Sequence, residues 1–194
     1  MIFLSNNKKL FLYQIISLIL SSILGILFHF TYNLSGNNKI IALFSAVNES
    51  TWEHLKLIFF PMLITTILGY IFLKDNFSNF LCVRTIAIIS AMLFTIIFFY
   101  TYTGILGKNI AFVDISSFFI SILIGEYITD LLINNKIKCN KTIAIAFLFF
   151  ILILFVIFTF NPPKIQLFKD PITSSYGIFK LFFYICENFG SSIF

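Results

Sequence analysis

Charged residues are scarce in this chain of 194 amino acids, where they make up 11% of the total. Cysteine occurs three times, histidine twice and tryptophan once. With so few cysteines, and with no Cys-x-x-Cys pair or His-Glu-x-x-His run, the familiar zinc-site patterns are absent. The signatures of phosphate-binding loops, dinucleotide-binding folds and serine hydrolases are missing as well. No motif-defined enzyme class is indicated.

Apolar residues, in contrast, make up 59% of the chain, and most of them fall in five long runs. A helix needs about 20 apolar residues to cross a hydrocarbon core of about 30 Å, and helices satisfy their own backbone hydrogen bonds in lipid. The sequence therefore predicts an all-α membrane protein, a helical bundle forming one domain over residues 1–194. The expected spans are Leu10–Tyr32, Leu57–Leu73, Phe80–Tyr102, Ile110–Ile133 and Thr142–Phe160.

Two further apolar segments are shorter than these spans. Ile40–Val47 has the length of an interfacial or re-entrant helix, which would bring the residues after it to the bundle. In the tail, residues 161–194, the segment Tyr176–Cys186 is interrupted by Lys180, and we expect a helix lying in the outer interface over the bundle. The alternative is a short sixth crossing of the membrane.

The basic residues predict an orientation in the cell membrane. With the N-terminus inside, the inner segments carry seven of them and the outer loops three, so the positive-inside rule places the N-terminus in the cytoplasm and the C-terminus outside. The net charge of +5 is scattered through loops and forms no patch, so the expected partner is the lipid bilayer and not a nucleic acid. The inner residues are Lys8, Lys9, Lys74, Arg84, Lys136, Lys138 and Lys141, and those of the outer loops are Lys39, Lys56 and Lys108. The outer tail adds Lys164, Lys169 and Lys180, which weakens the asymmetry.

The same orientation separates the cysteines. Cys82 and Cys139 fall on the inner side and Cys186 on the outer side. This distribution predicts no intramolecular disulfide framework.

Unusual polar residues gather at the predicted outer face of the membrane. His29 lies near the end of the first span, His54 comes just before the second, and Asp114 lies near the start of the fourth. Each ends a stripe of small or hydroxylated residues at helical spacing, which is typical of packed membrane helices. We therefore expect these three side chains to meet.

The run from Asn48 to Lys56 has a structural interpretation. Ser50 and Glu53 have the spacing of a capping box, in which Glu53 would bond back to the amide of Ser50 and Glu53→Gln would be tolerated. Trp52 at a membrane boundary is typical of an interfacial anchor. Only His54 is left unexplained by helix-start chemistry.

The functional interpretation places these polar residues around one outer pocket. Imidazole and carboxylate groups can ligate a divalent metal ion or transfer a proton, whereas the structural alternative is a hydrogen-bonded plug without metal. The candidate pocket residues are His29, Asn48, Glu49, Glu53, His54 and Asp114, and the candidate metal ligands are His29, His54, Glu53 and Asp114.

Lower on the fourth span, Glu126 and Asp130 lie one turn apart. They form either an interfacial acid pair beside lysines or a relay that extends from Asp114 across the membrane. Arg84 is either their partner or extends to the head groups.

The run Val47–Leu57 resembles the hallmark of a family of small bacterial integral membrane proteins of unknown function. The similarity extends to His29-Phe30, to Asp114 and to the tail motifs Asn161–Pro163, Phe168–Pro171 and Tyr176-Gly177. The resemblance implies a polytopic membrane protein and supplies no activity.

Three functions remain open at this stage. The first is a membrane protein whose outer pocket binds or transports a small ligand or ion. The second is a membrane-embedded enzyme that uses His, Glu and Asp as acid–base groups or metal ligands. The third is an accessory subunit without a site of its own. Transport would require a polar path through the bilayer, and only the fourth span offers one.

Overall fold

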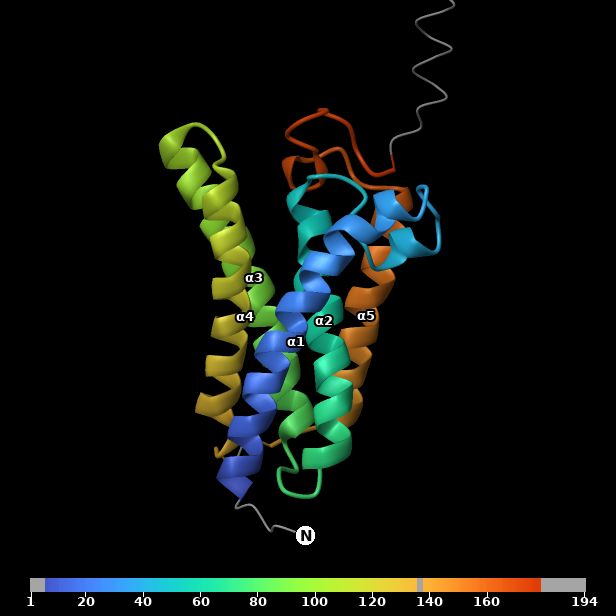
Figure 1. Cartoon of the computed structure of the whole chain (residues 1–194). Coiled ribbons are helices and arrows are strands. Elements are labelled where there is room, and N and C mark those ends of the chain that lie inside the picture. The colour runs from blue at the N-terminus through green and yellow to red at the C-terminus, as the bar shows by residue number, and fades with distance from the viewer. Residues whose placement is uncertain (1–5, 136–137, 179–194) are drawn as a thin grey trace, which may run out of the picture.

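The computed structural model describes residues 6–135 and 138–178, which form five long helices (Figure 1). All five are long and apolar enough to cross a membrane, so the predicted all-α, multi-pass architecture is confirmed. The helices are α1 Asn6–Leu34, α2 Thr51–Leu73, α3 Phe80–Leu106, α4 Ala111–Ile133 and α5 Lys141–Phe160.

Helix α2 begins earlier than predicted, at Thr51 and not at Leu57. The side chain of Ser50 accepts a hydrogen bond from the amide of Glu53 at 3.4 Å, which caps the helix at its polar end. The hydropathy of the sequence missed this turn because it is polar. As a consequence His54 lies in the first turn of α2.

The helices pack in neighbouring pairs. Helix α1 packs along α2, α3 packs along α4, and α2 with α3 joins the two pairs, while α5 packs against α3. At the upper end of Figure 1 the ribbons of α3 and α4 diverge from those of α1, α2 and α5. We call this the cavity end, where α1, α3 and α5 finish, and the opposite end, near the N-terminus, the disulfide end.

Glycine permits the closest helix contacts, as the small-residue stripes predict. A Cβ atom at Gly25 of α1 would lie 2.4 Å from a ring carbon of Phe118 on α4 and 2.7 Å from the carbonyl oxygen of Leu57 on α2. A side chain at Gly25 would therefore separate three helices just below the cavity end.

Trp52 is not exposed at the membrane boundary. Its ring centroid lies 4.9 Å from those of Phe155 on α5 and Phe168 in the tail, and the residue is 9% exposed. The tail forms a 3₁₀ turn, η2 (Gln166–Phe168), that contacts α2 and buries the indole. The interfacial-anchor expectation fails because the tail folds over this residue.

The short segments differ from expectation in extent. Within Ile40–Val47 the structure has a single 3₁₀ turn, η1 (Ile41–Leu43), and no longer helix. Ser45 pins the segment to α1, because its hydroxyl accepts from the Tyr32 amide at 2.9 Å and donates to the Phe28 carbonyl. Most of the predicted tail helix, Tyr176–Cys186, lies outside the described residues.

Cys82 and Cys139 form a disulfide with a Cα–Cα distance of 5.7 Å, so the prediction of no intramolecular bridge was wrong. The bond joins the start of α3 to the segment before α5. Hydropathy predicts the ends of helices but not which helices are neighbours, and these two positions are 57 residues apart in sequence. Disulfides are typical of oxidising compartments, whereas the lysines at this end predict cytoplasm, so the two indications give opposite orientations. The predicted orientation stays a prediction.

Candidate ligand and metal site

Two imidazoles and one carboxylate converge at the cavity end. The Nε2 atom of His54 lies 3.3 Å from Oε2 of Glu49, and Nε2 of His29 lies 3.9 Å from Oε1 of the same carboxylate. The two imidazole rings are 5.4 Å apart. One potential ligand atom from each of the three residues lies within 4.8 Å of the others. In the described part of the chain, this is the group of side chains that could hold a metal ion.

Each residue is positioned by its local structure. His29 comes from the last turns of α1, His54 from the first turn of α2, and Glu49 from the segment between them. Asn48 fixes that segment, because its Oδ1 accepts from the Ser50 amide and its Nδ2 donates to the Gly177 carbonyl, both at 2.9 Å. Asn48 is thus a structural link between this segment and the tail.

A backbone hydrogen bond orients the ring of His54. Its Nδ1 lies 3.0 Å from the carbonyl oxygen of Ser50, so Nδ1 carries a proton and donates it. The other nitrogen, Nε2, then faces the carboxylate of Glu49. A hydrogen bond from the ring of His54 is the main cause that holds the pKa of the Glu49 carboxyl below its usual value.

His29 leaves one polar atom without a partner. Its Nδ1 is buried and has no hydrogen bond within the described residues. The side chains of His29 and His54 are about a third exposed, at 30% and 35%, so both remain accessible. Neither imidazole is a fully satisfied core histidine.

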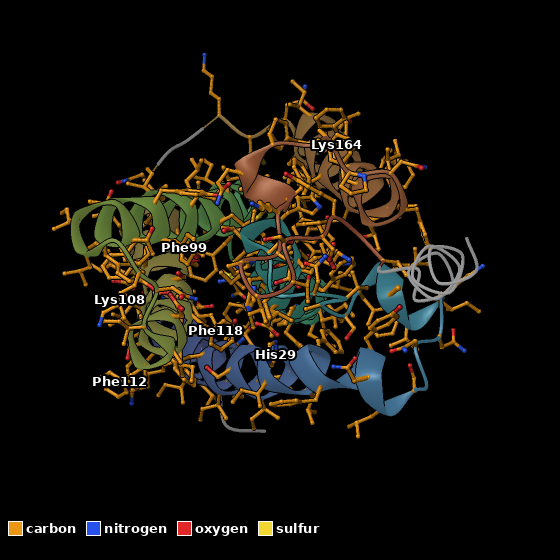
Figure 2. All side chains as sticks on the ribbon, turned by 90° about the horizontal axis from the view of Figure 1, so that it is seen from above. His29, Phe99, Lys108, Phe112, Phe118 and Lys164 are labelled. Carbon is orange, nitrogen blue, oxygen red and sulfur yellow. A yellow bond between two sulfur atoms is a disulfide. The ribbon has the colours of Figure 1, made fainter. Side chains whose placement is uncertain are left out.

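These residues form the polar part of a cavity of about 540 Å³. Side chains from α1, α2, α3 and α4 line it, and Pro171 and Ile172 of the tail contribute as well. Figure 2, which looks down on this end, shows Phe118 of α4 between His29 of α1 and Phe99 of α3 in projection. Aromatic and aliphatic side chains therefore form the walls beside the histidines.

Asp114 lines the same cavity but is engaged elsewhere. Its carboxylate accepts a hydrogen bond from the hydroxyl of Tyr102, which in turn accepts from the Ile110 amide at 3.2 Å. Of the residues predicted to meet, His29 and His54 lie together, and Asp114 lies across the cavity outside the group that could hold a metal ion.

Glu53 lies outside the cavity, and only one of the two hydrogen bonds of the predicted capping box forms, from the Glu53 amide to the Ser50 hydroxyl. Its carboxylate does not bond the Ser50 amide, which pairs with Asn48 instead. It accepts from the ammonium of Lys56 at 2.7 Å, from the Val47 amide at 3.1 Å and from the Thr159 hydroxyl at 3.4 Å. Glu53 is 1% exposed, so it is a buried ion-pair partner and no metal ligand.

Sequence reasoning took Lys56 for a loop charge, whereas it is fully buried. Besides Glu53, its ammonium donates to the carbonyls of Ala42 at 2.8 Å and Ser45 at 3.4 Å. All three ammonium protons thus have an acceptor. The signal available in the sequence was the i, i+3 spacing of Glu53 and Lys56 on one helix.

At the disulfide end, Arg84 pairs with Glu126 at 2.8 Å and is fully buried, as one of its two predicted roles requires. Its other guanidinium bonds, between 3.1 and 3.3 Å, go to hydroxyls of α1, α2 and α4. Asp130 is exposed and takes no part in the pair. The hydroxyl partners are Ser17, Thr65, Thr66 and Thr129.

The fold and the site together define a multi-pass membrane protein with a polar-ended cavity among its helices. The chain belongs to a family of unknown function, DUF6512, whose model matches residues 2–178. Comparison with curated proteins gives no match, and comparison with solved structures gives none.

Proposed function

We propose that this membrane protein binds a small amphiphilic molecule in the cavity at the cavity end. The observation that carries the proposal is the arrangement of the cavity walls. His29, Glu49, His54 and Asp114 supply polar groups to a cavity whose other lining is mainly aromatic and aliphatic. Ligand sites in proteins have this character, with a few polar groups that orient a mostly apolar molecule.

The position of the cavity among membrane-crossing helices supports an occupant that comes from the bilayer. Ile26 of α1 and Ile115 of α4 both line the cavity, and they are 47% and 60% exposed on the bundle surface. The cavity therefore reaches the lipid-facing surface between α1 and α4. An apolar tail would lie beside Phe118, and a head group bearing hydroxyls would reach the carboxylates of Glu49 and Asp114, which accept hydrogen bonds.

Passage of an ion through the bundle is less well supported. Thr95, which lines the cavity, shares a hydrogen bond with the hydroxyl of Ser121 at 2.7 Å, and the polar stripe on α4 then reaches Glu126. There the guanidinium of Arg84 donates a hydrogen bond to the carboxylate of Glu126. A cation would have to displace this buried pair.

An enzyme is the second candidate, and the pairing of His54 with Glu49 favours it. An imidazole beside a carboxylate, open to a cavity, has the chemistry of a general acid–base group. This reading needs the cavity end alone, whereas an accessory subunit would need neither the cavity nor its polar groups.

Two neighbouring serines on α4 allow a matched test of ligand binding. Ser117 is buried and lines the cavity, while Ser116 is on the same helix outside the lining. We expect a lipid-sized, hydroxyl-bearing molecule to co-purify with the wild type and with Ser116→Phe, and to be lost from Ser117→Phe, as measured by mass spectrometry of solvent extracts. Equal extracts from all three folded proteins would refute the proposal.

A further inference from the structure

We propose that His29, Glu49 and His54 hold one divalent transition-metal ion of the zinc class at the polar end of the cavity. The inference deepens the proposed function, because the ion would lie beside the head group of the amphiphile. Metal binding itself requires only these three side chains, so it can be tested separately.

The donor set fits this class of ion. Two imidazole nitrogens and one carboxylate oxygen are ligands that zinc takes in sites with three protein ligands, whereas magnesium and calcium prefer oxygen alone. The single carboxylate faces both histidines, so one ion can contact all three residues.

The spacing of the donors fits as well. Bonds of about 2.1 Å at tetrahedral angles place two ligand atoms about 3.4 Å apart. The separations of Glu49 from His54 and from His29 are 3.3 Å and 3.9 Å, on either side of that value. All three ligand atoms lie within 4.8 Å of one another, so rotations of these partly exposed side chains that move the donors by about 1 Å would complete the site.

Hydrogen bonding around the ring of His54 leads to the same conclusion. Metal-bound histidines usually donate their second ring N–H to a backbone carbonyl or a carboxylate, and Nδ1 of His54 donates to the Ser50 carbonyl. Nε2 then faces a carboxylate oxygen 3.3 Å away. Two acceptors at this distance repel each other unless a proton or a cation lies between them.

Protons alone satisfy this site poorly. Protonating both imidazoles would place two positive charges on rings 5.4 Å apart beside a single carboxylate. A metal ion replaces two protons by one centre that all three groups can share.

The surroundings hold the three ligands in place and leave room for a fourth. Lys56 and Glu53 bind the backbone of the segment that precedes Glu49, which orders this ligand before any ion binds. Zinc sites with three protein ligands keep an open position for water or substrate, and here the open side faces the cavity. A hydroxyl oxygen of the bound amphiphile is suited to this position.

Elemental analysis of the full chain tests the proposal. The protein is purified in detergent with a tag free of histidine, and zinc is measured by mass spectrometry before and after chelation. We expect about one zinc per chain, lost on chelation and regained on adding Zn²⁺. His54→Gln and Glu49→Gln should each weaken Zn²⁺ binding at least about 100-fold, whereas Asp114→Asn, across the cavity, should retain it.

Two further variants keep the outcomes distinct. His29→Gln changes a partly exposed residue and serves if His54→Gln fails to fold, as judged by size-exclusion chromatography. Ser117→Phe should lose the co-purified amphiphile and keep the zinc, so failure of the proposed function does not mimic failure of the metal site. A wild-type protein that contains no zinc and whose melting temperature ignores added Zn²⁺ would overturn the inference, as would unchanged Zn²⁺ affinity in the two histidine variants.

Discussion

The bundle contains a closed polar cluster at the disulfide end and an open one at the cavity end. In the closed cluster Arg84 is fully buried, and each of its guanidinium nitrogens has a bonded partner, the carboxylate of Glu126 among them. Oε1 of Glu126 accepts the bond from Arg84, while its Oε2 has no partner in the described structure. In the open cluster the imidazoles are about a third exposed, Nε2 of His54 faces an acceptor, and Nδ1 of His29 has no partner in the described structure.

The difference distinguishes polar residues that stabilise the fold from polar residues that are available to bind a ligand, within one membrane domain. A buried charge is tolerated when an opposite charge and hydrogen bonds compensate it, as Glu126 and four hydroxyl groups do for Arg84. A cluster with unmet donors and acceptors beside a cavity gains from an ion or a head group. Disrupting the closed cluster should therefore lower stability and leave binding unchanged. Disrupting the open cluster should abolish binding with little effect on stability.

The largest effect is expected at the closed cluster. Arg84→Met leaves the buried carboxylate of Glu126 without its cation, which should cost about 3–5 kcal/mol of unfolding free energy. Unfolding in detergent with increasing SDS measures this loss, and Asp130→Asn, at an exposed position on α4, should change stability by less than about 0.5 kcal/mol. Zinc affinity of the folded fraction should stay unchanged, and a loss of zinc without a loss of stability would contradict the division.

A smaller but still large effect is expected at Glu53. Because its carboxylate is buried against Lys56, Glu53→Gln leaves an ammonium without its counter-charge and should cost about 3 kcal/mol, contrary to the tolerance that a capping box implies. The double variant with Lys56→Met should recover part of this loss. A single variant as stable as the wild type in SDS unfolding would restore the capping interpretation.

The disulfide contributes next. Replacing Cys82 by serine should reduce the unfolding free energy by about 2–4 kcal/mol, because the cross-link restricts the unfolded chain. In a Cys186→Ser background, the two remaining thiols should react with a maleimide polymer in denaturant only after reduction, which a gel shift detects. Modification without reductant would show that they are not joined.

The smallest effect is that of pH on the metal-free open cluster. The pKa of Glu49 is lowered in the folded protein, so its contribution is fully present above the ordinary carboxyl pKa and is lost as the pH falls through the lowered value. The side chain is 43% exposed, so the contribution should stay below about 1 kcal/mol. Melting temperatures of chelated protein across this acid range should fall in the wild type and fall less in Glu49→Gln.

Much of this fold follows from the sequence, and the reason is physical. Long apolar runs have one stable form in lipid, so the five helices could be predicted from hydropathy. The positions of His29 and His54 near span ends on one face could be predicted in the same way, and the two residues lie together in the structure.

The remaining features depend on how the helices neighbour one another. The sequence places Lys56 in a loop because α2 begins with a polar turn, whereas its side chain bonds the carbonyl of Ala42 in the 3₁₀ turn η1. The bridge between Cys82 and Cys139 depends on α3 lying beside the segment before α5. Such lateral contacts leave no periodic signal in a single sequence.

The open cluster can be tested most directly by anomalous X-ray diffraction from crystals of the zinc-treated full chain, recorded on both sides of the zinc absorption edge. The account predicts one strong anomalous peak about 2.0–2.2 Å from nitrogen atoms of His29 and His54 and from an oxygen of Glu49, with no peak at Arg84 and Glu126. Crystals without a peak at the three residues, or with zinc bound at the closed cluster, would contradict it.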